Sequence, residues 1–183
     1  MSSSNLRALL VSGCAVCVAL APAGAQAATA TTPVKHPTPA ERLLLDSHEL
    51  WATIDVCDPT DAPDTVGIRG SMPGDKHAHD QMFMSFRLQY LEAKTNSWLD
   101  VDPGATPAFV PVGAGASSRQ GGTSFQLVPK AGSAAVTLRG VVDVQWRRGK
   151  KLVLAGARTT SAGHKALAGA DPAGYNAATC SIA

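Results

Sequence analysis

Two long stretches of the chain alternate apolar and polar side chains, which is the pattern of a β-strand with one buried face. In residues 82–90 the even positions are apolar, and residues 136–146 repeat the pattern with Gly140 in register. A helix would scatter these apolar groups around its circumference, so both stretches are predicted to be strands. The apolar members are Met82, Met84, Phe86, Leu88, Tyr90, Val136, Leu138, Val142, Val144 and Trp146.

Six shorter segments also carry strand signals and are separated by residues typical of turns. These strands are predicted at residues 50–56, 66–68, 98–101, 125–128, 151–157 and 177–182. Turns are predicted at residues 72–75, 102–104 and 147–150. The last turn joins two strong strand signals by a very short connection, which predicts a hairpin. Residues 111–124 are rich in Gly and Ser and are predicted to be a loop.

The residues around the first predicted strand leave one choice open. Thr38-Pro39-Ala40-Glu41 spells a capping box with proline at the first helical position, which predicts one or two helical turns. The run Leu43-Leu44-Leu45 would serve equally well in an edge strand. In residues 50–56 the even positions are apolar, so Cys57 falls on the opposite face. A bulge or twist is therefore needed if Cys57 points into the core.

Composition limits the fold class. Of the 183 residues, 45% are hydrophobic, 16% are charged, 17 are Gly and 12 are Pro. So few charges and so many turn-forming residues argue against coiled coils and helical repeats. The low net charge argues against a chain that is disordered throughout. The sequence predicts an all-β, immunoglobulin-like antiparallel β-sandwich of seven or more strands, as a single domain over residues 40–183.

The N-terminal residues are typical of an export signal. Arg7 precedes an apolar run at residues 8–20, and Ala25-Gln26-Ala27 offers small residues at a cleavage site. Residues 1–27 are predicted to be a signal peptide, and residues 28–39 a flexible Thr/Pro-rich spacer. The run is too short for a transmembrane helix, so we expect a secreted, extracellular chain. Alternatively, Val11-Ser12-Gly13-Cys14 resembles a bacterial lipobox, which would anchor the chain through a lipid on Cys14.

Cleavage at that site would leave two cysteines, Cys57 and Cys180. In an oxidising compartment they are predicted to form one intramolecular disulfide, closing a loop of 123 residues (180 − 57). The chain-entropy account assigns such a loop about 4–5 kcal/mol of stabilisation. The alternatives are two buried free thiols or a bridge between two chains.

The end of the chain carries a family resemblance. Asp171-Pro172-Ala173-Gly174-Tyr175, followed by Cys180, resembles the tyrosine corner that precedes the second cysteine of immunoglobulin-type domains. Tyr175 and Cys180 are five residues apart, where that motif has two. The whole chain is similar to small uncharacterised secreted proteins of high-G+C bacteria. That resemblance implies an architecture and supplies no activity, because such sandwiches carry unrelated functions.

Catalytic signatures are missing from the sequence. No phosphate-binding GxxxxGK[ST], GxGxxG or GxSxG motif occurs, and His48-Glu49 lacks the second histidine of a zinc-protease motif. With both remaining cysteines assigned to a bridge, a thiol nucleophile is not expected. We therefore expect a non-enzymatic protein without a cofactor, and keep a hydrolase on a sandwich scaffold as the third reading.

Two clusters suggest metal binding. The first consists of Asp55, Asp58, Asp61 and Asp64, spaced every third residue, whose oxygens could hold Ca²⁺. Aspartate is also an ordinary turn residue. The second is His77 and His79, which would share one face of a strand and could chelate a transition metal with Asp80 as an outer partner. A third ligand would have to come from another histidine, such as His36, His48 or His164.

Charge is distributed unevenly along the chain. Residues 28–112 hold six basic and twelve acidic residues, a net charge of −6, whereas residues 113–183 hold nine and two, a net charge of +7. The two halves could neutralise each other across neighbouring strands. Alternatively, an exposed basic tip could contact anionic cell-envelope polymer or lipid headgroups. The residues of this basic tip are Arg147, Arg148, Lys150 and Lys151.

The function expected from the sequence is a structural or binding role at the cell exterior, with no ligand specified. The alternative is a module that binds a metal through the aspartate cluster or an anionic glycan through the basic tip. Nucleic acid is not expected as a partner, because the exported chain has few aromatic residues on which bases could stack.

Overall fold

The structure is a computed structural model that describes residues 37–105, 108–129, 132, 134–164 and 168–183. The predicted signal peptide, most of the predicted spacer, and Cys14 and His36 lie outside the described residues. Within the described ranges, no helix combines the length and the apolar character needed to cross a membrane.

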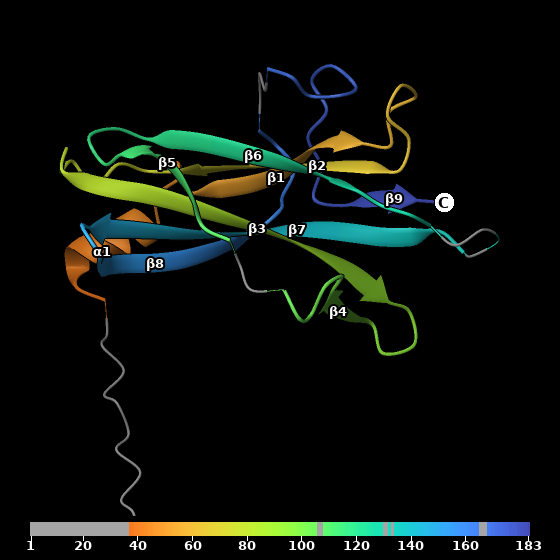
Figure 1. Cartoon of the computed structure of the whole chain (residues 1–183), viewed down its shortest axis with the longest axis horizontal. Coiled ribbons are helices and arrows are strands. Elements are labelled where there is room, and N and C mark those ends of the chain that lie inside the picture. Colours follow the sequence, from red (N-terminus) through yellow and green to blue (C-terminus); the bar gives the residue numbers. More distant parts are fainter. Residues whose placement is uncertain (1–36, 106–107, 130–131, 133, 165–167) are drawn as a thin grey trace, which may run out of the picture. The chain divides into compact units, whose positions relative to one another are not determined.

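Nine strands form two antiparallel sheets that lie face to face, which confirms the predicted β-sandwich (Figure 1). The smaller sheet has the order β1 (Trp51–Cys57), β2 (Thr65–Met72), β6 (Arg119–Gln126). The larger sheet has the order β4 (Ser97–Asp100), β3 (Asp80–Glu92), β7 (Val136–Arg148), β8 (Lys151–Thr159). In addition, β5 (Val110–Ala114) pairs with β3, and β9 (Cys180–Ile182) pairs with β7.

Strands β3 and β7 are the central pair of the larger sheet. They pair without interruption from Asp80 opposite Arg148 to Tyr90 opposite Leu138. Each strand is 13 residues long, so two shorter strands fit one after the other along its other edge. The two long alternations in the sequence are these two strands, and both predictions are confirmed.

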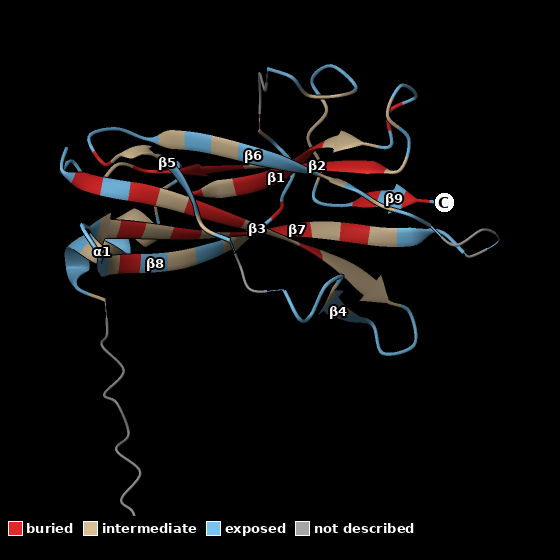
Figure 2. Cartoon of the chain, in the orientation of Figure 1, coloured by how far each residue is buried: buried red, intermediate tan, exposed pale blue. Residues whose placement is uncertain are grey.

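The core lies between the two sheets and uses the residues whose alternation predicted the strands (Figure 2). Trp146 is fully buried, and its Nε1–H donates a hydrogen bond to the carbonyl oxygen of Pro73 at 3.0 Å. This bond removes the cost of burying an unpaired donor. The fully or almost fully buried apolar side chains include Ile54, Val66, Ile68, Met72, Met82, Met84, Leu138, Val142, Val144 and Trp146.

Cys57 and Cys180 form the predicted disulfide, which joins β1 of the smaller sheet to β9 of the larger one. Their Cα atoms are 5.7 Å apart, in the usual range for a disulfide. The pairing of β1 with β2 shifts register between Ile54 and Val56. This irregularity is the bulge that the position of Cys57 required.

The segment left open between helix and strand is a helix, α1 (Pro39–Leu45). Thr38 Oγ1 accepts a hydrogen bond from the N–H of Glu41, and the Glu41 carboxylate accepts one from the N–H of Thr38. Both bonds of the capping box are therefore present. Leu44 and Leu45 pack partly against the core.

The loop predicted at residues 111–124 is wrong, because this segment contains most of β5 and of β6. The side chains of β6 bury little, but its main chain pairs with β2 from Arg119 opposite Met72 to Gln126 opposite Thr65. Glycine also suits the position, since a Cβ on Gly122 would lie 3.0 Å from the carbonyl oxygen of Ile68. The Gly- and Ser-rich composition did not indicate β6, because this strand has no apolar face of its own. It is held instead by main-chain hydrogen bonds to the neighbouring strand β2.

The segment that resembles a tyrosine corner lies beside β1. The N–H of Tyr175 donates to the carbonyl oxygen of Pro172 at 2.8 Å, and Tyr175 packs partly against the core. Ile54 and Ala177 exchange two main-chain hydrogen bonds. The segment thus covers the outer edge of β1, and the resemblance to immunoglobulin-type domains stays a prediction.

Candidate functional site

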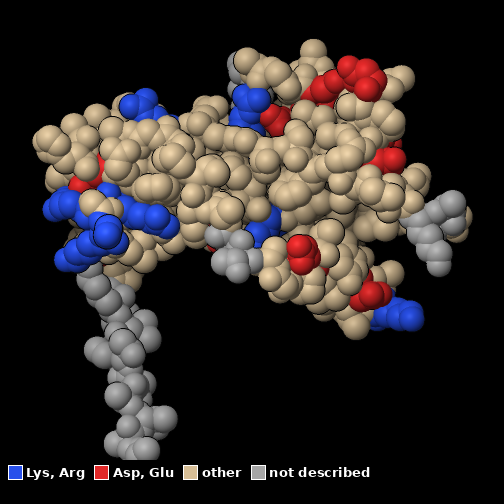
Figure 3. Space-filling model, viewed as in Figure 1, with Lys and Arg blue, Asp and Glu red and all other residues tan. Residues whose placement is uncertain are grey.

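The predicted hairpin at residues 147–150 is present and carries the basic tip. Strands β7 and β8 pair up to Arg148 opposite Lys151, and Gly149 in the turn has a φ of 58°. Such a left-handed conformation favours glycine. Figure 3 shows Lys and Arg side chains gathered at this end of the molecule, at the left of the view, and most of the visible Asp and Glu side chains at the other end. The two charge classes are thus partly separated in space.

Arg148 is held by a buried carboxylate. Its Nε and Nη2 donate to the two oxygens of Asp80 at 2.7 and 2.9 Å. The Asp80 side chain is 0% exposed, whereas that of Arg148 is 59% exposed. The Arg148 guanidinium holds the pKa of the Asp80 carboxyl below its usual value. This bidentate pair fixes the base of the hairpin against the start of β3.

The other three residues of the basic tip differ in their surroundings. The Arg147 guanidinium lies 4.3 Å from the centre of the Phe83 ring, and its Nε donates to Oε1 of Gln145 at 2.7 Å. Lys150 and Lys151 are exposed. Within the described part of the chain, neither lysine has an ion pair or a side-chain hydrogen bond. The tip therefore combines two arginines with protein partners and two lysines open to solvent.

A mixed group of acid and imidazole side chains lies next to Arg148. Asp75, His77 and Asp80 each place one possible metal-ligating atom within 4.8 Å of the others. His77 Nδ1 is 3.6 Å from Asp75 Oδ2, and the His77 main-chain N–H donates to Asp75 Oδ1 at 2.9 Å. Burial, and a hydrogen bond with the Asp80 carboxyl, raise the pKa of Asp75. Sequence reasoning missed Asp75 because it ends a Pro-Gly turn; its nearness to His77 in the chain was the available signal.

The predicted metal ligands are not brought together as expected. His79 is exposed and lies outside the Asp75/His77/Asp80 group. Among the described residues, that group is the one in which three possible metal ligands lie close together. The four aspartates predicted for Ca²⁺ are also outside it. Asp55 is buried and pairs with Arg69 at 2.7 Å, while Asp58 Oδ1 accepts a hydrogen bond from the N–H of Asp64 at 2.8 Å. Asp61 is exposed.

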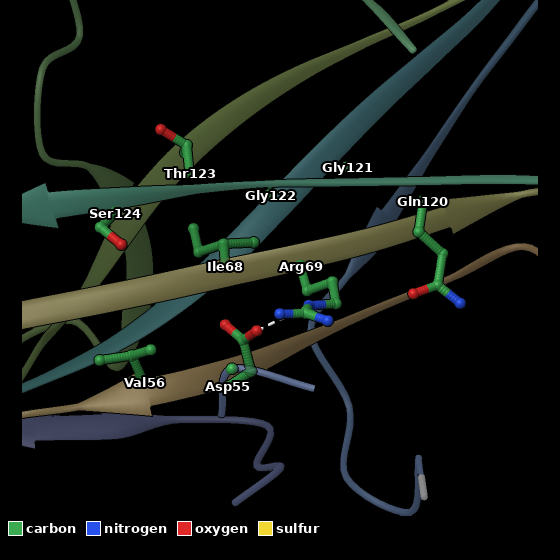
Figure 4. Close-up of a pocket in the computed structure, with 10 residues that line it drawn as sticks. Asp55, Val56, Ile68, Arg69, Gln120, Gly121, Gly122, Thr123 and Ser124 are labelled. Atoms are coloured by element: carbon green, nitrogen blue, oxygen red, sulfur yellow. Dashed lines mark hydrogen bonds and ion pairs between the residues drawn. The ribbon is translucent and has the colours of Figure 1, made fainter. Parts of the chain in front are cut away.

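A polar groove of about 570 Å³ runs along the outer face of the smaller sheet (Figure 4). The paired Asp55 and Arg69 lie on β1 and β2, and Gln120 and Ser124 come from β6. Arg69 Nη2 also donates to the carbonyl oxygen of Ala168 at 2.6 Å. The groove offers hydrogen-bonding groups to a polar ligand, but both of its charged side chains already have partners. It was missed because residues 111–124 were predicted to be a loop.

An apolar pocket of about 340 Å³ lies elsewhere on the domain. Three of its lining side chains, Val101, Val128 and Val136, are among the exposed large hydrophobic residues. Val128 is 95% exposed. The pocket can accept an apolar group, and it has no charged side chain among its described lining residues.

No protein-family model matches the chain, and no curated protein matches it.

Proposed function

We propose that this chain is an exported, non-enzymatic binding module that attaches to anionic polymer at the cell exterior through its basic tip. The observation that carries the proposal is the pair of exposed lysines, Lys150 and Lys151, on a hairpin fixed at its base by the Arg148–Asp80 pair. Because the main chain of this hairpin is already fixed, the lysines lose less backbone conformational freedom when they bind a partner.

The distribution of charge supports the same reading. Acidic groups such as Asp100 and Asp143 lie around Arg87 on the outer face of the larger sheet. The basic tip has four cations, against which stand the buried Asp80 beneath Arg148 and Asp75 beside Asp80. A local excess of positive charge attracts polyanions over about 8–10 Å at physiological salt.

Export is supported by two independent features. The N-terminal residues have the composition of a signal peptide, and the Cys57–Cys180 disulfide is of the kind that persists in oxidising compartments. An exported module at the cell exterior meets anionic glycans and wall polymers at high local concentration.

The test is binding of the mature chain to immobilised polygalacturonate, with neutral dextran as the reference matrix. Lys150→Glu/Lys151→Glu should weaken binding at least about tenfold, and the binding of the unchanged chain should fall steeply as salt rises. Lys94→Glu is the control for the single variant Lys150→Glu, because Lys94 is an exposed lysine in the β3–β4 turn. Equal losses for these two single variants would show that only net charge matters, and the proposal would be wrong.

A further inference from the structure

The 73–79 loop and the start of β3 bring two carboxyl groups and an imidazole to one point. The Asp75 side chain is 8% exposed and that of Asp80 is 0% exposed, while the His77 side chain is 63% exposed. The carboxyl groups of Asp75 and Asp80 each place an oxygen within 4.8 Å of the other. The group thus has a buried acidic floor and an imidazole at the solvent edge.

The two buried carboxyl groups differ in their partners. Arg148 donates to the Asp80 carboxylate through both Nε and Nη2. Within the described residues, no Lys or Arg pairs with Asp75, whose ion-pair partner is the imidazole of His77. Arg148 therefore pairs with Asp80, whereas the buried carboxyl of Asp75 faces the imidazole of His77. Buried carboxylates are ordinarily paired with cations or coordinate metals, and an imidazole is itself a metal ligand.

The distances suit a small ion. Two ligands bound to one Zn²⁺-sized ion at about 2.1 Å lie roughly 3–3.5 Å from each other. His77 Nδ1 and Asp75 Oδ2 are 3.6 Å apart, and all three possible ligand atoms lie within 4.8 Å of one another. A small closing movement of the exposed imidazole would bring them into range. Each oxygen of Asp80 has a second lone pair, so Asp80 can keep its bond to Arg148 while it binds an ion.

We propose that Asp75, His77 and Asp80 form a binding site for a divalent first-row transition metal such as Zn²⁺. One nitrogen and two oxygen ligands are a borderline set that suits Zn²⁺ and its neighbours. Ca²⁺ takes six to eight oxygen ligands and is not expected to bind here. The exposed side of His77 leaves coordination positions for water or for a ligand. This site shares Asp80 with the base of the basic tip but uses neither Lys150 nor Lys151, so it can be tested separately from the polymer binding proposed above.

The experiment is calorimetric titration of the tag-free mature chain with ZnCl₂, together with the shift of its melting temperature in Zn²⁺ and in Ca²⁺. The unchanged chain should bind one Zn²⁺ and melt at a higher temperature with Zn²⁺. His77→Ala and Asp75→Asn should each weaken Zn²⁺ binding by at least about tenfold. His77 is largely exposed, so His77→Ala should fold normally, which circular dichroism checks.

His79→Ala is the matched control, because His79 is an exposed histidine two residues away that lies outside the group. It should change Zn²⁺ affinity by less than about twofold. If His79→Ala weakens binding as much as His77→Ala while Asp75→Asn has no effect, the two exposed histidines chelate the ion and the proposed site is wrong. An unchanged melting temperature with Zn²⁺ and no heat of binding would also overturn it. Lys150→Glu/Lys151→Glu should leave Zn²⁺ binding intact, so failure of one proposal does not imply failure of the other.

Discussion

Strands β3 and β7 carry two clusters of arginine and aspartate that differ in how their charges are matched. At mid-strand, Arg87 pairs with Asp143 at 2.9 Å and with Asp100 at 3.0 Å, and Gln89 donates to Asp100 at 2.8 Å. The side chains of Arg87, Asp100 and Asp143 are between 23% and 32% exposed. Water can therefore replace a missing partner in this cluster.

The cluster at the strand ends combines buried carboxyl groups with incomplete pairing. Asp80 is out of reach of solvent, and Asp75 beside it has no Lys or Arg partner among the described residues. The exposed lysines of the basic tip follow two and three residues after Arg148 in the chain. At mid-strand both carboxylates contact the same partly exposed guanidinium, whereas among the described residues at the strand ends Asp75 has no Lys or Arg partner and Lys150 and Lys151 have no acidic partner. The strand-end cluster is therefore the better candidate for binding.

The largest effect is expected from the disulfide that holds the two sheets together. Cys57→Ser/Cys180→Ala should lower the free energy of unfolding by about 4–5 kcal/mol, because it removes a 123-residue constraint on the unfolded chain. Both clusters include residues of the paired strands β3 and β7, so they should still unfold in one transition. Urea unfolding followed by tryptophan fluorescence and by circular dichroism checks this, and two separate transitions would contradict it.

The next largest effect is a difference in melting temperature between variants of Arg148 and of Arg87. Arg148→Met should lower the melting temperature by roughly 5–10 °C, because it leaves Asp80 buried without its cation. Arg87→Met should lower it by about 2–5 °C, since Asp100 and Asp143 remain partly hydrated. Calorimetry of the two variants at neutral pH decides the order. A larger decrease in melting temperature for Arg87→Met than for Arg148→Met would show that the mid-strand cluster, and not the strand-end cluster, depends more on its arginine.

The smallest effect concerns the arginines that lie over aromatic rings. The guanidinium groups of Arg147 and Arg139 lie 4.3 Å from the ring centres of Phe83 and Trp98. Lysine at either position should cost about 0.5–1 kcal/mol, because it keeps the charge but loses the planar stacking. Arg147→Lys should also leave polygalacturonate binding within about twofold. A tenfold loss there would place Arg147 among the ligand contacts, together with the two lysines.

Much of the fold could be predicted because it depends on local patterns. Period-two alternation predicted β3 and β7. The capping box indicated α1 while an edge strand stayed open, and the position of Cys57 indicated a bulge or twist in β1 if Cys57 pointed into the core. The hairpin at Gly149 followed from its short connection. Each of these features is set by residues within a few positions of one another, so a single sequence contains the necessary information.

Tertiary structure alone decided the rest. Strands β5 and β6 form because neighbouring strands supply their main-chain hydrogen bonds, which no property of a Gly-rich segment indicates. Asp80 and Arg148 are 68 residues apart and meet only through the β3–β7 register. That register brings the polar 73–79 loop and the basic turn at residues 147–150 to the same end of the sheet. The strength of an electrostatic interaction depends on distance in space and on burial, and spacing along the chain encodes neither.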